Sequence, residues 1–296
     1  MFTDSHHLVS ILAAAIALFI ISATGCAVHT PMTTIEGLRT PLPADTIWDT
    51  ARSKPIDSAE LLDQLRQAQV VYVGERHTDP DHHAVQLKII KALYQADPTL
   101  AVGMEMFDHT YQEKLDRWSA GDYDWPTFLQ QVHWYANWRF DDALYRDILE
   151  FVQTNHLKLV GLNIPFWLPP KIAVGGLDSL SPSERALLPD RIDTSDPGHR
   201  EYVQKIYSMH RLKGRDNFEH FYAAQCAWED GMAQAIAENL GTGRMVVLVG
   251  NGHIEHKFGI PNRAFVRTQA PFKTIYTAVA GETLKPDIAD YIWVTP

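Results

Sequence analysis

Buried strands that alternate with helices from Ile47 onwards constrain the fold of this chain most strongly. Four apolar runs of roughly six to eight residues have the length and composition of strands covered on both faces. They lie at 69–74, 100–107, 157–164 and 244–250. Two more strands are predicted at 273–279 and 291–294, and helices at 57–66, 79–96, 111–120, 125–133 and 142–154. This order predicts an α/β domain over residues 47–296, with a mainly parallel sheet and helices on both of its faces.

The segment between the third and fourth strands is far longer than a crossover connection requires. It contains about 80 residues without a strand pattern, whereas a parallel crossover needs only about a dozen. The sequence therefore predicts a helical insertion, or lid, at about 165–240. In its last helix an apolar stripe recurs at three- and four-residue spacing, and core packing is the interpretation we favour. The stripe consists of Phe218, Phe221, Tyr222, Gln225, Trp228, Met232 and Ile236.

Polar side chains stand at or just beyond the ends of the four buried strands. Glu75 and His77 follow the first strand, and Glu105 lies near the end of the second. Asn163 ends the third strand, and His253 follows the fourth. Ligands of open α/β sheets bind outside the carboxyl ends of parallel strands. We therefore expect these side chains, although distant in the chain, to meet in one cleft.

Glu105 is the most informative of these polar residues. A carboxylate flanked by Met and Phe in a buried strand costs several kcal/mol unless it is paired or holds a cation. One interpretation is structural, with Glu75 and Glu105 pairing with nearby cationic side chains. The candidate partners are Arg76, His77 and His253. The functional interpretations, which are metal ligation and general acid–base catalysis, stay open beside it.

The remaining histidines and the known motifs are less specific. His82 and His83 lie in the first turn of a predicted helix at the same rim. His253 and His256 are three residues apart, a spacing that puts two side chains on one face of a helix. The sequence has no HExxH motif, no paired CxxC motifs, no Cys-x-x-Cys-His and no Gly-x-Ser-x-Gly. It therefore gives no support to a zincin, a structural zinc site, a covalent c-type haem or a nucleophile elbow.

Residues 1–25 are predicted to form a signal peptide that is cut in front of Cys26. The apolar run from Leu8 to Ala23 is shorter than the roughly 20 residues of a spanning helix and leads into Ala-Thr-Gly-Cys, whose small residues suit a lipoprotein-processing peptidase. The Cys26 thiol would carry diacylglycerol, and two or more acyl chains such as palmitate anchor a protein stably. An uncleaved anchor helix is the alternative, because residues 1–7 contain no Lys or Arg. No acidic residue follows Cys26, which favours the outer membrane of a Gram-negative bacterium.

Charge and cysteine content narrow the choice of partners. The net charge of −10 and the lack of a basic stripe exclude a nucleic-acid partner. The sequence contains only two cysteines, so acylation of Cys26 would leave no intrachain disulfide. Cys226 lies in an apolar helical stretch and is predicted to be a small core residue. Residues 26–46, rich in Thr and Pro, are predicted to be a flexible tether between lipid and domain.

Four motifs in order make the chain resemble the ChaN-like haem-binding lipoproteins. They are Val-Gly-Glu-Arg-His at 73–77 with His82-His83 after it, Val-Gly-Met-Glu-Met-Phe-Asp at 102–108, Ala-Ala-Gln-Cys-Ala-Trp-Glu-Asp-Gly-Met-Ala at 223–233, and Val-Gly-Asn-Gly-His-Ile at 249–254. The resemblance covers roughly residues 47–263. More distantly, the paired Gly-x-x-His motifs with internal glutamates resemble the Tiki and erythromycin-esterase superfamily of hydrolases.

The first resemblance implies a surface lipoprotein that holds ferric haem without a covalent bond, between two protomers, with tyrosine as the iron ligand. Ferric iron prefers an anionic oxygen, and a nearby His or Arg favours the phenolate. Tyr207 is our first candidate for the ligand, and His210 can share its helix face. The insertion supplies three further candidates for the haem site, namely Tyr202, Arg211 and Tyr222. For each tyrosine the structural alternative is packing on an amphipathic helix.

We favour a binding protein over an enzyme, namely an envelope lipoprotein for haem and iron uptake that works as a homodimer. The alternative is a metal-dependent hydrolase, either an esterase or a peptidase, at the strand ends. In that case His77 or His253 would activate water, and the two strand-end glutamates, Glu75 and Glu105, would bind a divalent metal or act as base. A third option is an envelope scaffold that binds no ligand.

Overall fold

The computed structural model describes residues 31–209 and 216–296 of the chain. The predicted signal peptide and three residues with predicted roles lie outside these ranges, namely Cys26, His210 and Arg211. Within the part described, no helix is both long and apolar enough to cross a membrane.

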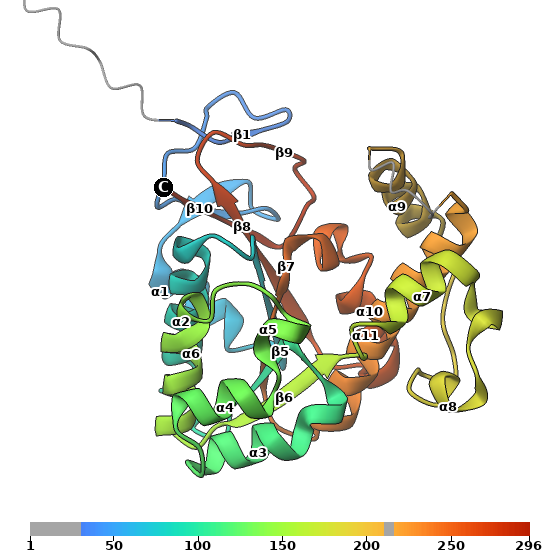
Figure 1. Cartoon of the computed structure of the whole chain (residues 1–296). Helices are drawn as coiled ribbons and strands as arrows, with labels where there is room; N and C mark the ends of the chain where they lie inside the picture. Colours follow the sequence, from blue (N-terminus) through green and yellow to red (C-terminus); the bar gives the residue numbers. More distant parts are fainter. Residues whose placement is uncertain (1–30, 210–215) are drawn as a thin grey trace, which may run out of the picture. The chain divides into compact units, whose positions relative to one another are not determined.

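An eight-stranded sheet forms the centre of the domain (Figure 1). Its strand order is β3-β2-β10-β8-β4-β7-β5-β6, and the strands from β10 to β6 are all parallel. β2 is antiparallel to both of its neighbours. The strands are β2 (Ile47–Asp49), β3 (Lys54–Ile56), β4 (Val70–Glu75), β5 (Ala101–Asp108), β6 (Lys158–Asn163), β7 (Met245–Gly250), β8 (Phe272–Val279) and β10 (Tyr291–Thr295). All predicted strands are therefore present, and the short β2 and β3 extend one edge.

Residues 31–46, which the sequence predicts to be part of a flexible tether, pack onto the domain instead. β1 (Thr34–Ile35) pairs in parallel with β9 (Thr283–Leu284). The side chains of Ile35 and Leu42 are buried in an apolar cluster with the outer strands of the main sheet. Strands of two residues are too short to leave a periodic pattern, so the sequence did not indicate them. The packed domain therefore begins earlier than predicted.

Helices cover one face of the sheet. Between the helices and the sheet lies a large apolar cluster that includes the buried rings of Trp118, Phe128 and Trp134. Asp57 and Asp79 cap the first two of these helices, because each side chain accepts a backbone N–H of the first turn. The helices on this side are α1 (Ser58–Leu65), α2 (Pro80–Tyr94), α3 (Gln112–Ala120), α4 (Trp125–Gln131), α5 (Trp134–Asn137) and α6 (Ala143–Thr154).

The opposite face is covered by α10 (Phe218–Leu240) and α11 (Ile260–Thr268). The predicted stripe of α10 is buried in part, because Met232 and Ile236 pack against the sheet while Trp228 is only half-buried. The same helix also buries two carboxylates, Glu229 and Asp230, which the apolar stripe did not include.

In the described residues between β6 and β7 the regular elements are all helical, as predicted for the insertion. Before α10 it forms α7 (Leu168–Gly175), α8 (Pro182–Arg185) and α9 (Pro197–Met209). In Figure 1 these helices lie to one side of the sheet, next to the first half of α10. The predicted fold class, an α/β domain with a mainly parallel sheet and a helical insertion before the fourth long strand, is confirmed.

Candidate functional site

The carboxyl ends of three neighbouring parallel strands bring the polar residues together. β7 lies between β4 and β5, so Glu75, Gly250 and Glu105 stand side by side. The pairing of β5 with β6 loses its register after Met104, and such irregularities re-aim side chains. The carboxylate of Glu105 consequently reaches across to β7 and accepts the backbone N–H of Gly250 at 2.7 Å.

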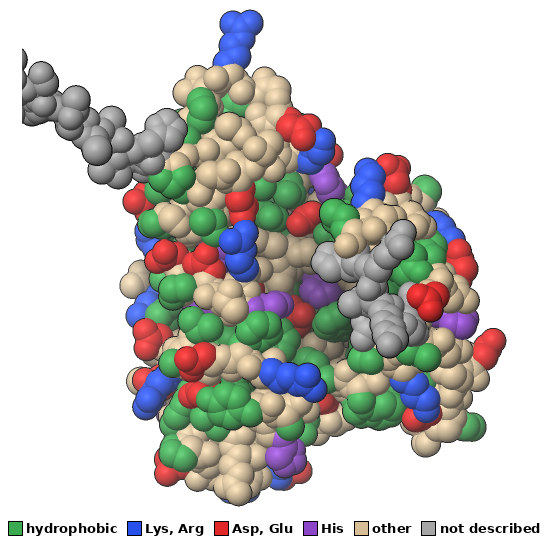
Figure 2. Space-filling model, turned by 45° about the horizontal axis from the view of Figure 1, so that its top comes forward, with side chains coloured by type: hydrophobic (Ala, Val, Ile, Leu, Met, Phe, Trp, Pro, Cys, Tyr) green, Lys and Arg blue, Asp and Glu red, His purple; other side chains and the backbone are tan. Residues whose placement is uncertain are grey.

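Five buried or half-buried side chains at this edge form what we call the strand-end cluster. Figure 2 shows histidine and acidic side chains on the floor of a hollow between the sheet body and the helical insertion. Such a position, outside the carboxyl ends of parallel strands, is where open α/β sheets bind ligands. The members of the cluster are Glu75, His77, Glu105, Glu229 and His253.

Glu75 is fully enclosed and its carboxylate is saturated with donors. His77 Nδ1 lies 2.7 Å from Oε1, and the Tyr145 hydroxyl donates to the same oxygen at 2.6 Å. Gln86 donates to Oε2 at 2.8 Å, and His83 Nδ1 lies 3.4 Å from that oxygen. Burial alone would raise the pKa of Glu75, but the two imidazoles lower it to about 2. Glu75 is therefore a carboxylate at every physiological pH.

His77 is the member of the cluster that reaches solvent, with 29% of its side chain exposed. Its ring packs against Trp138 and Phe140, with centroids 4.8 and 5.0 Å away. A Cβ at Gly250 would stand 3.0 Å from the His77 ring, so the glycine gives the imidazole room above the end of β7. Burial would lower the pKa of His77, yet Glu75 and Glu105 raise it above its ordinary value.

His253 lies between two buried carboxylates. Its Nε2 is 3.4 Å from Glu105 Oε1, and its Nδ1 is 3.3 Å from Glu229 Oε1. Burial would lower the pKa of His253, but the two carboxylates raise it to about 10. In turn, against the effect of burial, His253 lowers the pKa of Glu105. His253 and Glu105 are therefore both charged at neutral pH, and each stabilises the charge of the other.

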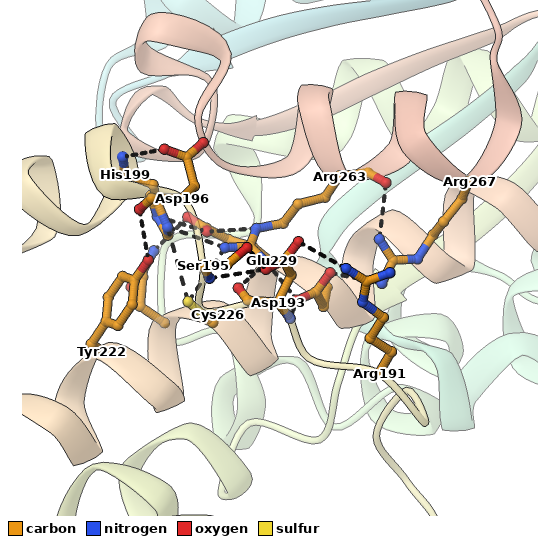
Figure 3. A network of polar contacts seen from close by, with 12 residues as sticks. Arg191, Asp193, Ser195, Asp196, His199, Tyr222, Cys226, Glu229, Arg263 and Arg267 are labelled. Carbon is orange, nitrogen blue, oxygen red and sulfur yellow. Dashed lines mark hydrogen bonds and ion pairs between the residues drawn. The ribbon is translucent and has the colours of Figure 1, made fainter.

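A second buried network continues from Glu229 into the insertion and α11 (Figure 3). His199 Nε2 lies 3.0 Å from Glu229 Oε2, and Arg263 Nε lies 3.4 Å from the same oxygen. Arg263 also forms an ion pair with Asp230, which accepts a second bond from Arg267 at 2.7 Å. Burial would raise the pKa of Glu229, but His199, His253 and Arg263 lower it well below the ordinary range.

Sequence reasoning missed Glu229, Asp230, His199 and Arg263. The two carboxylates follow Trp228 in a mostly apolar stretch of α10, and two adjacent acids in such a stretch are the pattern that could have revealed them. His199 and Arg263 carry no comparable pattern, because each lies alone in an ordinary amphipathic segment. Cys226 is buried as predicted, and burial raises the pKa of its thiol to about 12, although Arg263 opposes the shift.

The three described candidate tyrosines of the insertion differ in what their hydroxyls do. Tyr222 is only 1% exposed and donates to the carbonyl of Asp196 at 3.3 Å. Tyr202 donates to the carbonyl of Gly252 at 3.3 Å, and burial raises its pKa, which disfavours the phenolate. Tyr207 is half-buried, and its hydroxyl has no hydrogen-bond partner within residues 31–209 and 216–296.

Tyr207 belongs to a half-exposed apolar region that we call the insertion surface. Its ring packs against Phe218 and Phe221 with centroids 5.4 and 5.3 Å away. Phe221 in turn lines a cavity of about 270 Å³ between α7 and α10. We define the insertion surface as Tyr207, Val174 and the lining of this cavity, which is Phe166, Pro169, Pro170, Ala173, Phe221, Ala224, Gln225 and Trp228.

The structure corrects three expectations about the strand ends. Arg76 does not join the cluster, because its side chain points outwards and pairs with Glu282. His82 is buried but accepts the backbone N–H of Arg76 at 2.8 Å, whereas His83 contacts Glu75. His253 and His256 do not share a helix face, because the backbone of His256 has a φ of 53° that breaks the turn.

The hydrolase interpretation requires ligands for a divalent metal, and the described ranges contain no suitable set. Within residues 31–209 and 216–296, no three His, Cys, Asp or Glu side chains are arranged to hold a metal ion. In the cluster each imidazole already faces carboxylates, and each carboxylate already accepts from imidazole, amide, hydroxyl or guanidinium groups. This pairing corresponds to the structural interpretation of Glu105, with His77 and His253 as partners and Arg76 excluded.

Comparison with known proteins identifies the family of this chain and solved structures that are similar to it. The family model described as "Haem-binding uptake, Tiki superfamily, ChaN" matches residues 61–264. Protein RETICULATA-RELATED 5, chloroplastic, of Arabidopsis thaliana is 24% identical over 223 residues. The match covers 68% of this chain but 29% of that protein, so the chain spans less than a third of the plant relative's length.

Two solved structures are similar to this chain, and one of them shows the fold. ChaN of Campylobacter jejuni, described with cofacial haem binding, superposes with a TM-score of 0.68 at 20% identity and covers 83% of this chain and 95% of that chain. At this identity the likeness shows the fold. An open conformation of a mutant erythromycin esterase, EreC, gives a TM-score of 0.48 at 13% identity, over 80% of this chain and 76% of that one.

Proposed function

Since this chain belongs to the ChaN family of haem-binding uptake proteins in the Tiki superfamily, we propose that it captures ferric haem at the cell envelope through Tyr207. Membership of a haem-binding family supports haem as the ligand. The insertion surface is the part of the described chain that suits it, because it combines exposed apolar area with an unengaged tyrosine hydroxyl.

The single observation that carries this proposal is the state of the Tyr207 hydroxyl. Among the described tyrosines of the insertion, Tyr202 and Tyr222 both donate to backbone carbonyls, whereas Tyr207 has no such bond. Its ring is fixed by two phenylalanines, so the hydroxyl has a defined direction. A ligand oxygen has to be both held in place and unoccupied, and within residues 31–209 and 216–296 Tyr207 meets both conditions.

Ferric haem, when bound, supplies a hard cationic centre that takes an anionic oxygen ligand. Tyr207 would provide that oxygen as a phenolate, and a neighbouring cation would favour its deprotonation. His210 and Arg211 follow three and four residues later in the sequence and are the proposed source of this cation. The phenylalanines and prolines of the insertion surface would pack against the porphyrin faces and exclude water.

We also propose that two copies of the chain close over the bound haem. The cavity of about 270 Å³ is smaller than the roughly 300–1,000 Å³ of ordinary ligand pockets, so one copy would cover a porphyrin only in part. Val174, Trp167 and Met209 of the insertion are 61%, 49% and 72% exposed. Such exposed apolar side chains suit contact with a second subunit.

Anchoring and location form the last part of the proposal. The small residues before Cys26 support cleavage and lipidation there, which would tether the domain to the outer membrane of a Gram-negative bacterium. Haem capture at that membrane would serve iron uptake. Labelling with radioactive palmitate should mark the wild-type chain and leave Cys26→Ser unlabelled. An unlabelled wild type would contradict lipidation.

The haem proposal is tested by titrating the purified chain with ferric haem and recording the absorption spectrum. The wild type should show the charge-transfer band of a tyrosinate–iron complex. Tyr207→Phe should lose that band and bind haem at least about 100-fold more weakly, because it removes the ligand itself. Tyr202→Phe is the matched control and should keep the band. Loss of the band in Tyr202→Phe alone would reassign the ligand, and no spectral change in the wild type would overturn the proposal.

A further inference from the structure

Helix α9, which carries Tyr207, is attached to the domain through its first two turns. His199 is fully buried and contacts Glu229 of α10. Val203 packs with Tyr222 and Cys226 in a small apolar cluster. Tyr202 donates to the carbonyl of Gly252 just beyond β7. These contacts fix the start of α9, and further along the helix the Tyr207 ring packs against Phe218 and Phe221.

The contact between His199 and Glu229 has a defined polarity. Arg263 Nη2 lies 3.1 Å from His199 Nδ1, and an arginine can only donate, so Nδ1 is the acceptor. The ring hydrogen of His199 is then on Nε2, which lies 3.0 Å from Glu229 Oε2. The two atoms are close but not aligned as a hydrogen bond, so the attraction is between an N–H dipole and a full negative charge. That attraction depends on the charge of the carboxylate.

Glu229 divides its two oxygens between the insertion and the sheet. Oε2 faces His199 of α9, while Oε1 faces His253 at the end of β7 at 3.3 Å. Gln225, which lines the cavity of the insertion surface, also donates to Oε1 at 2.8 Å. One buried carboxylate of the strand-end cluster thus contacts His253, the helix of the candidate iron ligand and the wall of the candidate haem cavity.

The candidate ligand lies a short way beyond this anchor. Tyr207 follows His199 by eight residues, which is about 12 Å along a helix axis. A tilt of α9 about its first turn would therefore be amplified at Tyr207. Ligand sites tolerate such displacements poorly, because supporting groups fix the direction of the ligand.

We propose that Glu229 is a positioning residue for the haem site, whose negative charge fixes α9 and through it the direction of Tyr207. This inference rests on the proposed function, since Tyr207 is the ligand named there. It assigns the buried acid of the strand-end cluster a role that does not require catalysis. Glu229 itself touches neither haem nor iron.

Glu75 provides a matched control for a charge-removing substitution. Both glutamates are fully buried, each faces two imidazoles, and each accepts one glutamine amide at 2.8 Å. The partners of Glu75 lie on α2, on α6 and just beyond β4, outside the insertion. Glu75→Gln and Glu229→Gln therefore each remove one buried negative charge that faces two imidazoles, but only Glu229→Gln should affect α9.

The experiment measures amide hydrogen exchange of the full chain without haem, followed by haem titration of the same samples. In Glu229→Gln the amides of 197–209 should exchange at least about tenfold faster, because the attachment of α9 is weakened. Haem affinity should fall about tenfold, and the charge-transfer band of bound haem should shift in position. Glu75→Gln should leave α9 exchange, haem affinity and the band as in the wild type.

Each outcome decides one proposal. Wild-type α9 exchange in Glu229→Gln would overturn the positioning role, and so would faster exchange with unchanged haem affinity. A shifted band at saturating haem supports the role, because loss of folded protein lowers the height of a band without moving it. A wild type that binds no haem would defeat the proposed function, while the exchange data from the same samples would still decide whether Glu229 fixes α9.

Discussion

The strand-end cluster and the insertion surface differ in how completely their chemistry is used within the chain. In the cluster, each carboxylate faces imidazole, amide or hydroxyl donors and each imidazole faces a carboxylate. On the insertion surface, Val174 is 61% exposed, several rings are half-buried, and the Tyr207 hydroxyl has no partner in the described ranges. A group that is already saturated gains little from a ligand, whereas an exposed apolar face with an unused oxygen gains much. The difference supports our proposal that the insertion surface, and not the strand-end cluster, binds haem.

The largest effect that would test this comparison comes from breaking the buried network behind the cluster. Arg263 is 7% exposed and serves both Glu229 and Asp230. Arg263→Met should lower the free energy of unfolding by about 3–5 kcal/mol, because it leaves two carboxylates buried without their guanidinium. Urea denaturation followed by circular dichroism measures this. The exposed Arg191→Met is the control and should stay within about 1 kcal/mol of the wild type. Equal losses of unfolding free energy in Arg263→Met and Arg191→Met would show that the buried network does not stabilise the fold.

The next effect is the dependence of stability on pH. His253 has a folded pKa of about 10 against an ordinary 6.5, so its contribution is fully present below pH 6.5 and is lost as the pH rises through 10. Glu75 has a folded pKa of about 2 against 4.5, so its contribution is present above pH 4.5 and is lost as the pH falls to 2. Stability should therefore be greatest near pH 4.5–6.5.

The alkaline side of this profile separates His253 from the other groups. Between pH 6.5 and 10 the wild type should lose on the order of 3 kcal/mol of unfolding free energy through this residue. His253→Gln should be less stable at pH 6 and should lose much less between pH 6.5 and 10. Its acid side should become shallower but not flat, because Glu105 and Glu229 lose the imidazole that lowers their pKa values while Glu75 keeps its partners. An unaltered alkaline slope in His253→Gln would refute the assignment.

A smaller effect separates binding from stability on the insertion surface. Val174 is 61% exposed on α7, and Val266 is 66% exposed on α11 outside the insertion. Both Val→Ser changes should leave the unfolding free energy within about 0.5 kcal/mol of the wild type. Val174→Ser should weaken haem binding about fivefold, because about 1 kcal/mol of apolar burial is lost on closure. Equal haem affinities of Val174→Ser and Val266→Ser in a spectroscopic titration would exclude Val174 from the binding surface.

The same contrast explains what the sequence predicted and what it did not. The long strands were predictable because each is an unbroken apolar run, and the meeting of Glu75, Glu105 and His253 followed from the parallel sheet. The resemblance to ChaN-like proteins is confirmed by the family match. The order of strands was not predictable, because every buried strand has the same apolar pattern. The packing of residues 31–46 was missed, since strands of two residues leave no period.

Single buried polar residues were the other feature that the sequence did not predict. Glu229 and His199 act as a pair although they lie on different helices, and no spacing in the sequence connects them. Arg76 was expected in the cluster because it stands between Glu75 and His77 in the chain. Beyond the strand end, however, its side chain turns to the surface. Proximity in sequence therefore did not predict which residues belong to the strand-end cluster. The members share buried or half-buried side chains, which the sequence did not show. The iron ligand itself stays a prediction.

The smallest expected effect on stability tests whether Arg76 lies outside the strand-end cluster. Arg76 is 56% exposed at its side chain and pairs with Glu282, so water and salt screen the interaction. Arg76→Met should lower the unfolding free energy by less than about 1 kcal/mol, and the difference should vanish in about 1 M salt, where the Debye length is about 3 Å. Its pH profile should keep the acid and alkaline slopes of the wild type, because Glu75 and His253 keep all their partners. A loss as large as that of Arg263→Met, or a changed alkaline slope, would mean that the strand-end cluster extends to the surface, and its contrast with the insertion surface would then fail.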